Sequence, residues 1–261
     1  MRIFKNKVLI VEDSPTTQKL IGLHVNNSPN LRPVFALDYK SARKVLRQMG
    51  SDQILCAVLD LNLPDAPNGE VVDLVQEYQI PIIILTGQKS KAIQKTMEAK
   101  NIIDYVVKKH YRELEYIKDK VEGLYLNQKA TVLVVDDSKG CQNMIKLSLE
   151  NLCFNVLLCS GADEALEIIE KQEVTLAIID CHMEGIDGIE LTEILRDTYL
   201  KEDLAIIGVS GQGADNIAAK FLKIGANDYM YKPLITSEFY CRVQHNIDML
   251  RNIRIIKKAG R

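Results

Sequence analysis

The chain lacks every stretch that would suit a membrane or a nucleic acid. Its 261 residues contain no apolar run approaching the roughly 18 residues that a membrane-spanning helix needs. Lysine and arginine total 33 against 35 acidic residues, a formal net charge of −2, and no long basic run offers a footprint for nucleic acid or an anionic membrane. The first residues reach Glu12 and Asp13 too soon for a signal peptide. The six cysteines form no CxxC pair. These absences predict a cytoplasmic protein without nucleic-acid or membrane partners.

The sequence also lacks a Pro-rich or Gly/Ser-rich tether, although it is long enough for two domains. What it contains instead is a repeat. "KVLIVEDS" at 7–14 and "TVLVVDDS" at 131–138 match at five of eight positions, 124 residues apart. Between them, 111–130 predicts a last helix that runs almost directly into the next strand. The repeat predicts a first domain over 1–128, a second over 129–248, and an extension of the last helix over 249–261.

Each half alternates short apolar runs with longer amphipathic stretches. The runs predict strands at 7–12, 32–37, 54–60, 81–86 and 102–107, and again at 131–136, 154–159, 174–180, 204–209 and 227–231. The stretches between them predict helices, for example after Ser14, which can cap a helix, and Pro15, which suits a first helical position. Five such alternations indicate the α/β class. We expect two domains, each a five-stranded parallel sheet with helices on both faces.

Acidic, hydroxyl and basic residues follow the strands at the same places in each half. In the first half these residues are Glu12, Asp13, Asp60, Thr86 and Lys108, and in the second they are Asp136, Asp137, Asp180, Ser210 and Lys232. Parallel sheets bind ligands outside the carboxyl ends of their strands, so each set is expected to gather at one rim. For a single acidic pair, a solvated loop is the simpler explanation. The ordered set of five, found twice, favours a site.

The chemistry of each set suits magnesium and phosphate. Three carboxylates around one point form a hard-oxygen site for Mg²⁺, and the metal would neutralise the repulsion between adjacent acids. A carboxylate can itself attack phosphorus and form an acyl phosphate. The third-strand residue, Asp60 or Asp180, is the sensible nucleophile, with Asp13 or Asp137 on the metal. The lysine and the hydroxyl would stabilise the phosphoryl oxygens.

With these residues in place, each half resembles a receiver domain of bacterial two-component response regulators. The resemblance implies a flavodoxin-like fold and Mg²⁺-dependent phosphorylation of Asp60 and Asp180 by a histidine kinase or phosphotransfer protein. It further implies acidic pairs Glu12/Asp13 and Asp136/Asp137, switch pairs Thr86/Tyr105 and Ser210/Tyr229, and lysines Lys108 and Lys232. The backbone carbonyl of Asn62 or His182 would be a further metal ligand.

Both halves depart from the family pattern. A cis Lys-Pro bond usually follows the fifth strand, and Lys232-Pro233 fits, whereas the first half has Lys108-Lys109 and would carry a trans bond there. A proline usually lies four residues after the acceptor; it is present as Pro64, and Glu184 replaces it in the second half. We therefore expect Asp60 to be phosphorylated more slowly or less stably than Asp180.

Two alternative functions compete with the phosphoacceptor function. A pseudo-receiver would keep the fold and serve as a docking or dimerisation scaffold. Aspartyl-phosphate phosphatases share related chemistry but need a second aspartate two residues after the nucleophile, where this chain has Asn62 and His182. The sequence therefore predicts regulatory phosphoacceptor domains and no enzyme within these residues.

The output is predicted from the last segment. The sequence "SEFYCRVQHNIDMLRNIRIIKK" indicates one long helix with apolar Phe239, Val243, Ile247, Leu250, Ile253 and Ile256. The last three are expected to extend beyond the sheet, and such a stripe favours a homodimer or a following output domain. The arrangement is similar to the input half of some double-receiver diguanylate cyclases, of which this chain would be the N-terminal part. A complete stand-alone adaptor or phosphate sink is the alternative.

Overall fold

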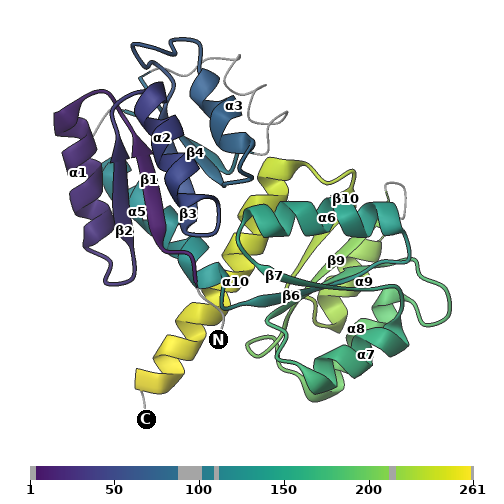
Figure 1. Ribbon diagram of the computed structural model, residues 1–261. Helices are drawn as coiled ribbons and strands as arrows, with labels where there is room; N and C mark the ends of the chain where they lie inside the picture. Colours follow the sequence, from purple (N-terminus) through teal and green to yellow (C-terminus); the bar gives the residue numbers. More distant parts are fainter. Residues whose placement is uncertain (1–3, 88–101, 109–111, 212–215, 260–261) are drawn as a thin grey trace. The chain divides into compact units, whose positions relative to one another are not determined.

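A computed structural model describes residues 4–87, 102–108, 112–211 and 216–259 (Figure 1). The chain separates into two compact units. Unit 1 comprises Met1–Lys129 together with Asn151–Cys153, and unit 2 comprises Ala130–Glu150 and Phe154–Arg261. Each unit has its own sheet and its own buried core.

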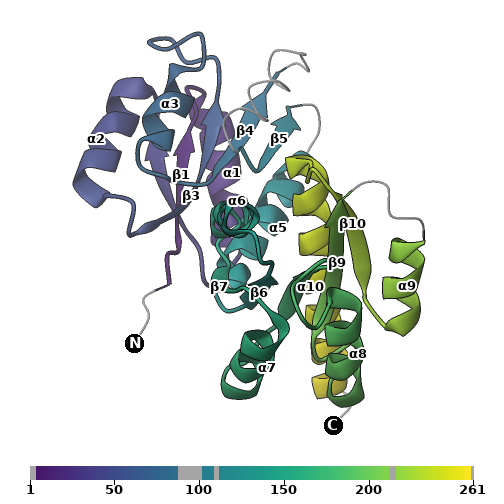
Figure 2. The same ribbon diagram turned by 90° about the vertical axis from the view of Figure 1, so that its right-hand side faces the viewer.

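Unit 1 is a parallel sheet of five strands in the order β2-β1-β3-β4-β5. The strands are β1 (Lys7–Val11), β2 (Arg32–Ala36), β3 (Ile54–Asp60), β4 (Ile82–Thr86) and β5 (Asp104–Val107). The helices described between and after them are α1 (Pro15–Asn26), α2 (Tyr39–Met49), α3 (Glu70–Gln76) and α5 (Arg112–Asn127). Helices α1 and α5 cover one face, and α2 and α3 cover the other (Figures 1 and 2).

Unit 2 repeats this arrangement in the order β7-β6-β8-β9-β10. Its strands are β6 (Thr131–Val135), β7 (Asn155–Cys159), β8 (Leu176–Asp180), β9 (Ala205–Gly211) and β10 (Asp228–Lys232). Its helices are α6 (Lys139–Asn151), α7 (Ala162–Lys171), α8 (Gly188–Thr198), α9 (Ile217–Ile224) and α10 (Thr236–Ala259). Helices α6 and α10 lie on one face, and α7, α8 and α9 lie on the other (Figure 2).

The predicted fold is confirmed in both units. Each sheet is parallel, with the second strand outside the first and the remaining strands following on the other side, which is the flavodoxin-like order. Every residue of β3 and β8 is buried, as expected for central strands covered on both faces. The strand bounds lie within two residues of the predicted ones, and β3 has the predicted bounds. Helix α1 begins as predicted, with Pro15 at its first position and the Ser14 side chain accepting a hydrogen bond from the Thr17 amide.

Helix α10 is the predicted long last helix, and its exposed part is shorter than expected. It runs for 24 residues, with Phe239, Val243, Ile247 and Leu250 buried. The prediction that Leu250 extends beyond the sheet is wrong: Leu250 is only 2% exposed, because it lies on the same helix face as Val243 and Ile247. Ile255 and Ile256 are 64% and 70% exposed. None of the helices in the described part of the chain is long and apolar enough to cross a membrane.

Candidate functional site

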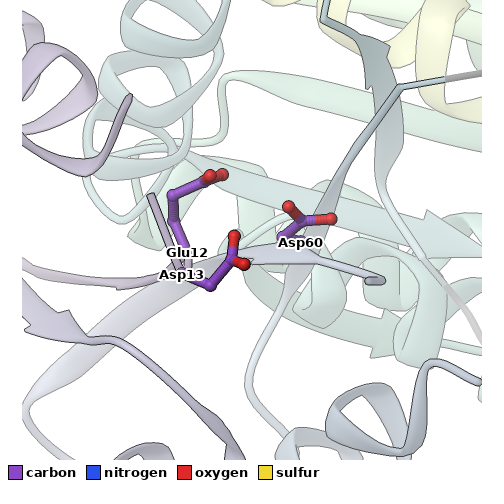
Figure 3. A group of neighbouring side chains, drawn as sticks. All are labelled: Glu12, Asp13 and Asp60. Carbon is purple, nitrogen blue, oxygen red and sulfur yellow. The ribbon is translucent and has the colours of Figure 1, made fainter. Parts of the chain in front are cut away.

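Three carboxylates meet at the carboxyl edge of the unit 1 sheet. Glu12 and Asp13 follow β1 and Asp60 ends β3, and their side chains face a common space (Figure 3). One carboxylate oxygen from each residue lies within 4.8 Å of those of the other two. Glu12 and Asp60 are buried, and Asp13 is exposed. The site therefore has two desolvated acids and one that reaches solvent.

Unit 2 contains the same group. Asp136 and Asp137 follow β6 and Asp180 ends β8, again with carboxylate oxygens within 4.8 Å of one another. The exposure pattern repeats, because Asp136 and Asp180 are buried while Asp137 is exposed. The register of the sheets explains both groups. Val11 pairs with Leu59 and Val135 with Ile179, so the next residue of each strand reaches the same edge.

A lysine from the fifth strand of each unit contacts the two buried acids. The Lys108 ammonium lies 2.6 Å from Glu12 and 2.5 Å from Asp60. The Lys232 ammonium lies 2.8 Å from Asp136 and 2.7 Å from Asp180. Burial lowers the pKa of both lysines, but the neighbouring carboxylates raise it by more, so each pKa is above its ordinary value. Both lysines are therefore cationic at neutral pH.

One buried carboxylate in each unit carries an electrostatic cost. Burial raises the pKa of Glu12 above its ordinary value, and the contacts with Lys108 offset only part of that rise. Burial and the neighbouring Asp136 likewise raise the pKa of Asp180, and Lys232 offsets only part. In each unit the lysine therefore does not fully compensate the burial of that acid. Two buried acids and one exposed acid at one point suit a hard divalent cation that keeps part of its water shell.

Each unit also has a hydroxyl side chain on its fourth strand and a tyrosine on its fifth. In unit 2, Ser210 and Tyr229 are buried and their hydroxyl groups share a short hydrogen bond. The Ser210 hydroxyl also donates to the Gly211 carbonyl at 3.0 Å, so Tyr229 is the donor in the shared bond. Burial raises the pKa of Tyr229, which keeps its proton in place. In unit 1, Thr86 is buried at the end of β4, and Tyr105 on β5 is partly buried against the core.

The segments after the acceptors contact them through backbone amides. The Asn62 amide donates to Asp60 Oδ1 at 2.9 Å, and the His182 amide donates to Asp180. The proposed metal-binding carbonyls of Asn62 and His182 stay a prediction. The Lys232-Pro233 bond is cis, as expected. Lys109 lies outside the described residues, and the trans bond of the first half stays a prediction.

Two glutamines beside the acidic pairs were not among the site residues predicted from the sequence. Gln18 on α1 and Gln142 on α6 are buried and donate hydrogen bonds to the backbone at Glu12 and Asp136. A pattern in the sequence could have revealed them. They are the same residue type, 124 positions apart, which is the spacing that relates Asp13 to Asp137 and Lys108 to Lys232.

Comparison with known proteins gives two matches within this chain to one family model. The model describes the response regulator receiver domain and matches residues 8–119 and 132–244. Among characterised relatives, the regulatory protein VanR of Enterococcus faecium is 32% identical over 129 residues, which are 49% of this chain and 54% of VanR. The phosphate regulon regulator PhoB of Pseudomonas aeruginosa is 30% identical over 114 residues, which are 44% of this chain and 50% of PhoB. The chain thus spans about half the length of these relatives.

Solved structures also match over both units together. A two-component system response regulator/GGDEF domain protein is 36% identical, with a TM-score of 0.81, and covers 95% of this chain and 100% of the other. A second structure with an equivalent description has the same identity and coverage and a TM-score of 0.80. Both matches therefore include the residues of both units.

Proposed function

Because the chain belongs to the response regulator receiver family, with one receiver domain in each half, we propose that Asp60 and Asp180 accept a phosphoryl group in a Mg²⁺-dependent reaction. We assign receiver 1 to residues 1–128 and receiver 2 to residues 129–248. The supporting observation is that each acceptor ends a central buried strand, beside a second buried acid and within 2.5 to 2.7 Å of a lysine ammonium. The same arrangement occurs in both halves.

The chemistry follows from these positions. An oxygen of the Asp60 or Asp180 carboxylate attacks the phosphorus of a phosphohistidine, the P–N bond breaks, and the imidazole leaves with its electron pair and takes a proton. The product is an aspartyl phosphate. Its charge is met by the ammonium of Lys108 or Lys232 and by the hydroxyl of Thr86 or Ser210.

Magnesium would be held by the carboxylates that surround each acceptor. Glu12, Asp13 and Asp60 would bind it in receiver 1, and Asp136, Asp137 and Asp180 in receiver 2. When bound, the ion supplies positive charge to the phosphoryl oxygens. The carbonyls of Asn62 and His182 would complete the protein ligands. The charge balance supports this assignment, because the pKa values of Glu12 and Asp180 stay raised with only a lysine as counter-ion.

The proposed phosphate donor is a histidine kinase or phosphotransfer protein, and exposed apolar side chains beside each site support protein docking. On α1, Leu20 and Leu23 are 41% and 53% exposed. At the equivalent positions of α6, Met144 and Leu147 are 43% and 61% exposed. Each pair lies on the helix that begins directly after the acidic pair, so a partner covering it would reach the acceptor.

The proposed output is control of self-association or of a C-terminal domain such as a diguanylate cyclase. Residues 249–261 are the assigned extension of the last helix, and in its described part Met249, Ile255 and Ile256 are exposed. Figure 1 shows α10 continuing past the sheet of its own unit. Exposed apolar residues at the end of a helix favour pairing, and the simplest partner is a second copy in a two-fold dimer. A pseudo-receiver scaffold and a stand-alone adaptor or phosphate sink are the competing functions.

Sedimentation velocity with and without beryllofluoride and Mg²⁺ separates these functions. We expect the phosphate mimic to strengthen self-association, and truncation after Asp248 to remove that response. A chain that stays monomeric in both states and is indifferent to the truncation would contradict the dimer. A mimic that binds without changing association would favour the phosphate sink, and a mimic that does not bind would favour the pseudo-receiver.

A further inference from the structure

Gln18 and Gln142 are buried polar side chains that the phosphoryl chemistry does not use directly. Gln18 is 9% exposed on α1, and Gln142 is 7% exposed on α6. Neither lies among the carboxylates, the lysine or the hydroxyl of its receiver. Each is the fourth residue of the helix that follows the first strand, 124 positions from its counterpart.

Gln18 uses its side-chain amide to join two strand ends. Its Nε2 donates to the carbonyl oxygen of Glu12 at 3.3 Å and to that of Ala36 at 2.8 Å. A primary amide nitrogen carries two hydrogens, so both are used. Glu12 follows β1 and Ala36 ends β2, and the two strands are neighbours in the sheet.

Gln142 makes the same pair of contacts in receiver 2. Its Nε2 donates to the carbonyl oxygen of Asp136 at 2.6 Å and to that of Cys159 at 3.0 Å, with the Ser160 hydroxyl at 3.4 Å. Asp136 follows β6, and Cys159 ends the neighbouring β7. The contact therefore occurs twice in the chain, between equivalent atoms.

The position of these carbonyls explains what the contact does. The Glu12 carbonyl belongs to the peptide unit that links Glu12 to Asp13, and the Asp136 carbonyl belongs to the unit that links Asp136 to Asp137. The amide of each first acid makes a last hydrogen bond to the neighbouring strand, Glu12 to Ala36 at 3.1 Å and Asp136 to Cys159 at 3.2 Å. Beyond that bond the chain leaves the sheet. The carbonyl then needs a partner elsewhere, and the glutamine provides it.

We infer that Gln18 and Gln142 are positioning residues that fix the peptide unit between the two acids of each receiver, and so set the direction of the carboxylates that hold the metal. The inference rests on the proposed Mg²⁺ site. Groups that orient metal ligands from behind change affinity when they are removed, typically by roughly 10- to 100-fold. A glutamine with both amide hydrogens on the backbone beside the ligands is such a group.

The test is an NMR titration of the full chain with Mg²⁺, because backbone amide shifts report the two receivers separately. In Gln142→Met, which keeps the length of the side chain but has no donor, we expect Mg²⁺ to bind receiver 2 about 10- to 100-fold more weakly. Receiver 1 should bind as in the wild type and is the internal control. In Gln18→Met the affected receiver should be the first, which keeps the test available if one variant fails to fold.

A matched control separates positioning from general loss of stability. Asn246, on α10, is also a buried amide, and its side chain donates to the Arg242 carbonyl at 2.9 Å. Asn246→Leu therefore removes a buried amide-to-carbonyl bond that touches neither acidic pair, and Mg²⁺ affinity should be unchanged. Wild-type affinity in both glutamine variants would overturn the inference and leave the proposed function intact. No Mg²⁺ response at either wild-type receiver would overturn both.

Discussion

The hydroxyl of Tyr229 donates a hydrogen bond to the hydroxyl of Ser210, and Ser210 in turn donates to the carbonyl of Gly211. The Ser210 proton is therefore engaged by the Gly211 carbonyl and not free for a phosphoryl group on Asp180. We predict that phosphorylation of Asp180 makes Ser210 exchange these partners. Because Tyr229 reaches Ser210 from the neighbouring strand, the exchange also releases the tyrosine hydroxyl. A phosphoryl group on Asp180 is therefore predicted to change the contacts of Tyr229 on β10.

Tyr229→Phe is predicted to speed phosphorylation of Asp180 by a small phosphodonor. The substitution keeps the ring and removes one hydrogen bond, a contribution of about 0.5–1.5 kcal/mol, which corresponds to roughly 2- to 13-fold in rate. Initial rates from intact-mass measurements would show it. Ser210→Ala is the paired variant and should be slower, because it removes the donor itself. A Tyr229→Phe rate below that of the wild type would contradict this role of the hydrogen bond.

Asp180→Asn is predicted to stabilise the metal-free chain at pH 7. A carboxyl whose pKa is raised in the folded state binds its proton more tightly there than in the unfolded chain, so stability falls as the pH rises through that pKa. Burial and Asp136 raise the pKa of Asp180 above 3.8, so the ionised group opposes folding at neutral pH. The neutral asparagine removes that cost.

Denaturant unfolding of both chains in EDTA measures this effect. The advantage of Asp180→Asn should shrink as the pH is lowered from 7 toward 3.8, because the wild-type carboxyl becomes protonated. It should also shrink with Mg²⁺, which stabilises the wild type by binding its folded state. A variant that is less stable than the wild type in EDTA at pH 7 would contradict the prediction.

Gly188→Ala is predicted to displace the acceptor loop of receiver 2. A Cβ at Gly188, the first residue of α8, would lie 2.0 Å from the carbonyl oxygen of Asp180. The backbone must shift, at a cost of about 1–3 kcal/mol, and phosphorylation of Asp180 should slow with it. Gly140→Ala on α6 is the matched control, since its Cβ would meet only the Ser138 hydroxyl at 3.8 Å. That control should be neutral or slightly stabilising in thermal unfolding. Wild-type stability and phosphorylation in Gly188→Ala would show that the backbone shift is not needed.

Lys257→Glu is predicted to loosen the end of α10. Lys257 lies 2.5 Å from Glu202, and Arg254 lies 3.4 Å from Glu173, so two cations of the extension contact acids of receiver 2. An exposed pair contributes about 0.2–1 kcal/mol, so the change should appear as faster amide exchange over residues 251–259. High salt should have a similar effect. Glu202→Lys in the same chain should restore protection, and a double variant no better protected than the single one would exclude the pair.

Much of the fold and the arrangement of the sites was predictable from the repeat. The strands of a parallel sheet all end at the same edge, so the acids and lysines at the predicted strand ends meet in space. The hydroxyl residues lie at the ends of the neighbouring strands. The burial of Leu250 on α10 was not predictable. Helical spacing gives the face of the helix on which Leu250 lies, but it does not show how far along the helix the rest of the domain covers that face. The hydrogen bond between Tyr229 and Ser210 depends on side-chain rotamers, and the role of Gln18 depends on the positions of two backbone carbonyls. The periodicity of the sequence predicts neither of these.

The central claim is that each receiver accepts phosphate on its third-strand aspartate, and intact-mass measurement of four chains tests it most directly. Wild type, Asp60→Asn, Asp180→Asn and the double variant would be incubated with a small phosphodonor, with Mg²⁺ and with EDTA. We predict phosphate on the wild type only with Mg²⁺, a larger loss from Asp180→Asn than from Asp60→Asn, and none on the double variant. Labelling of the double variant equal to that of the wild type would contradict the account. Loss of all labelling in Asp60→Asn, with no change in Asp180→Asn, would reverse the order of the two receivers.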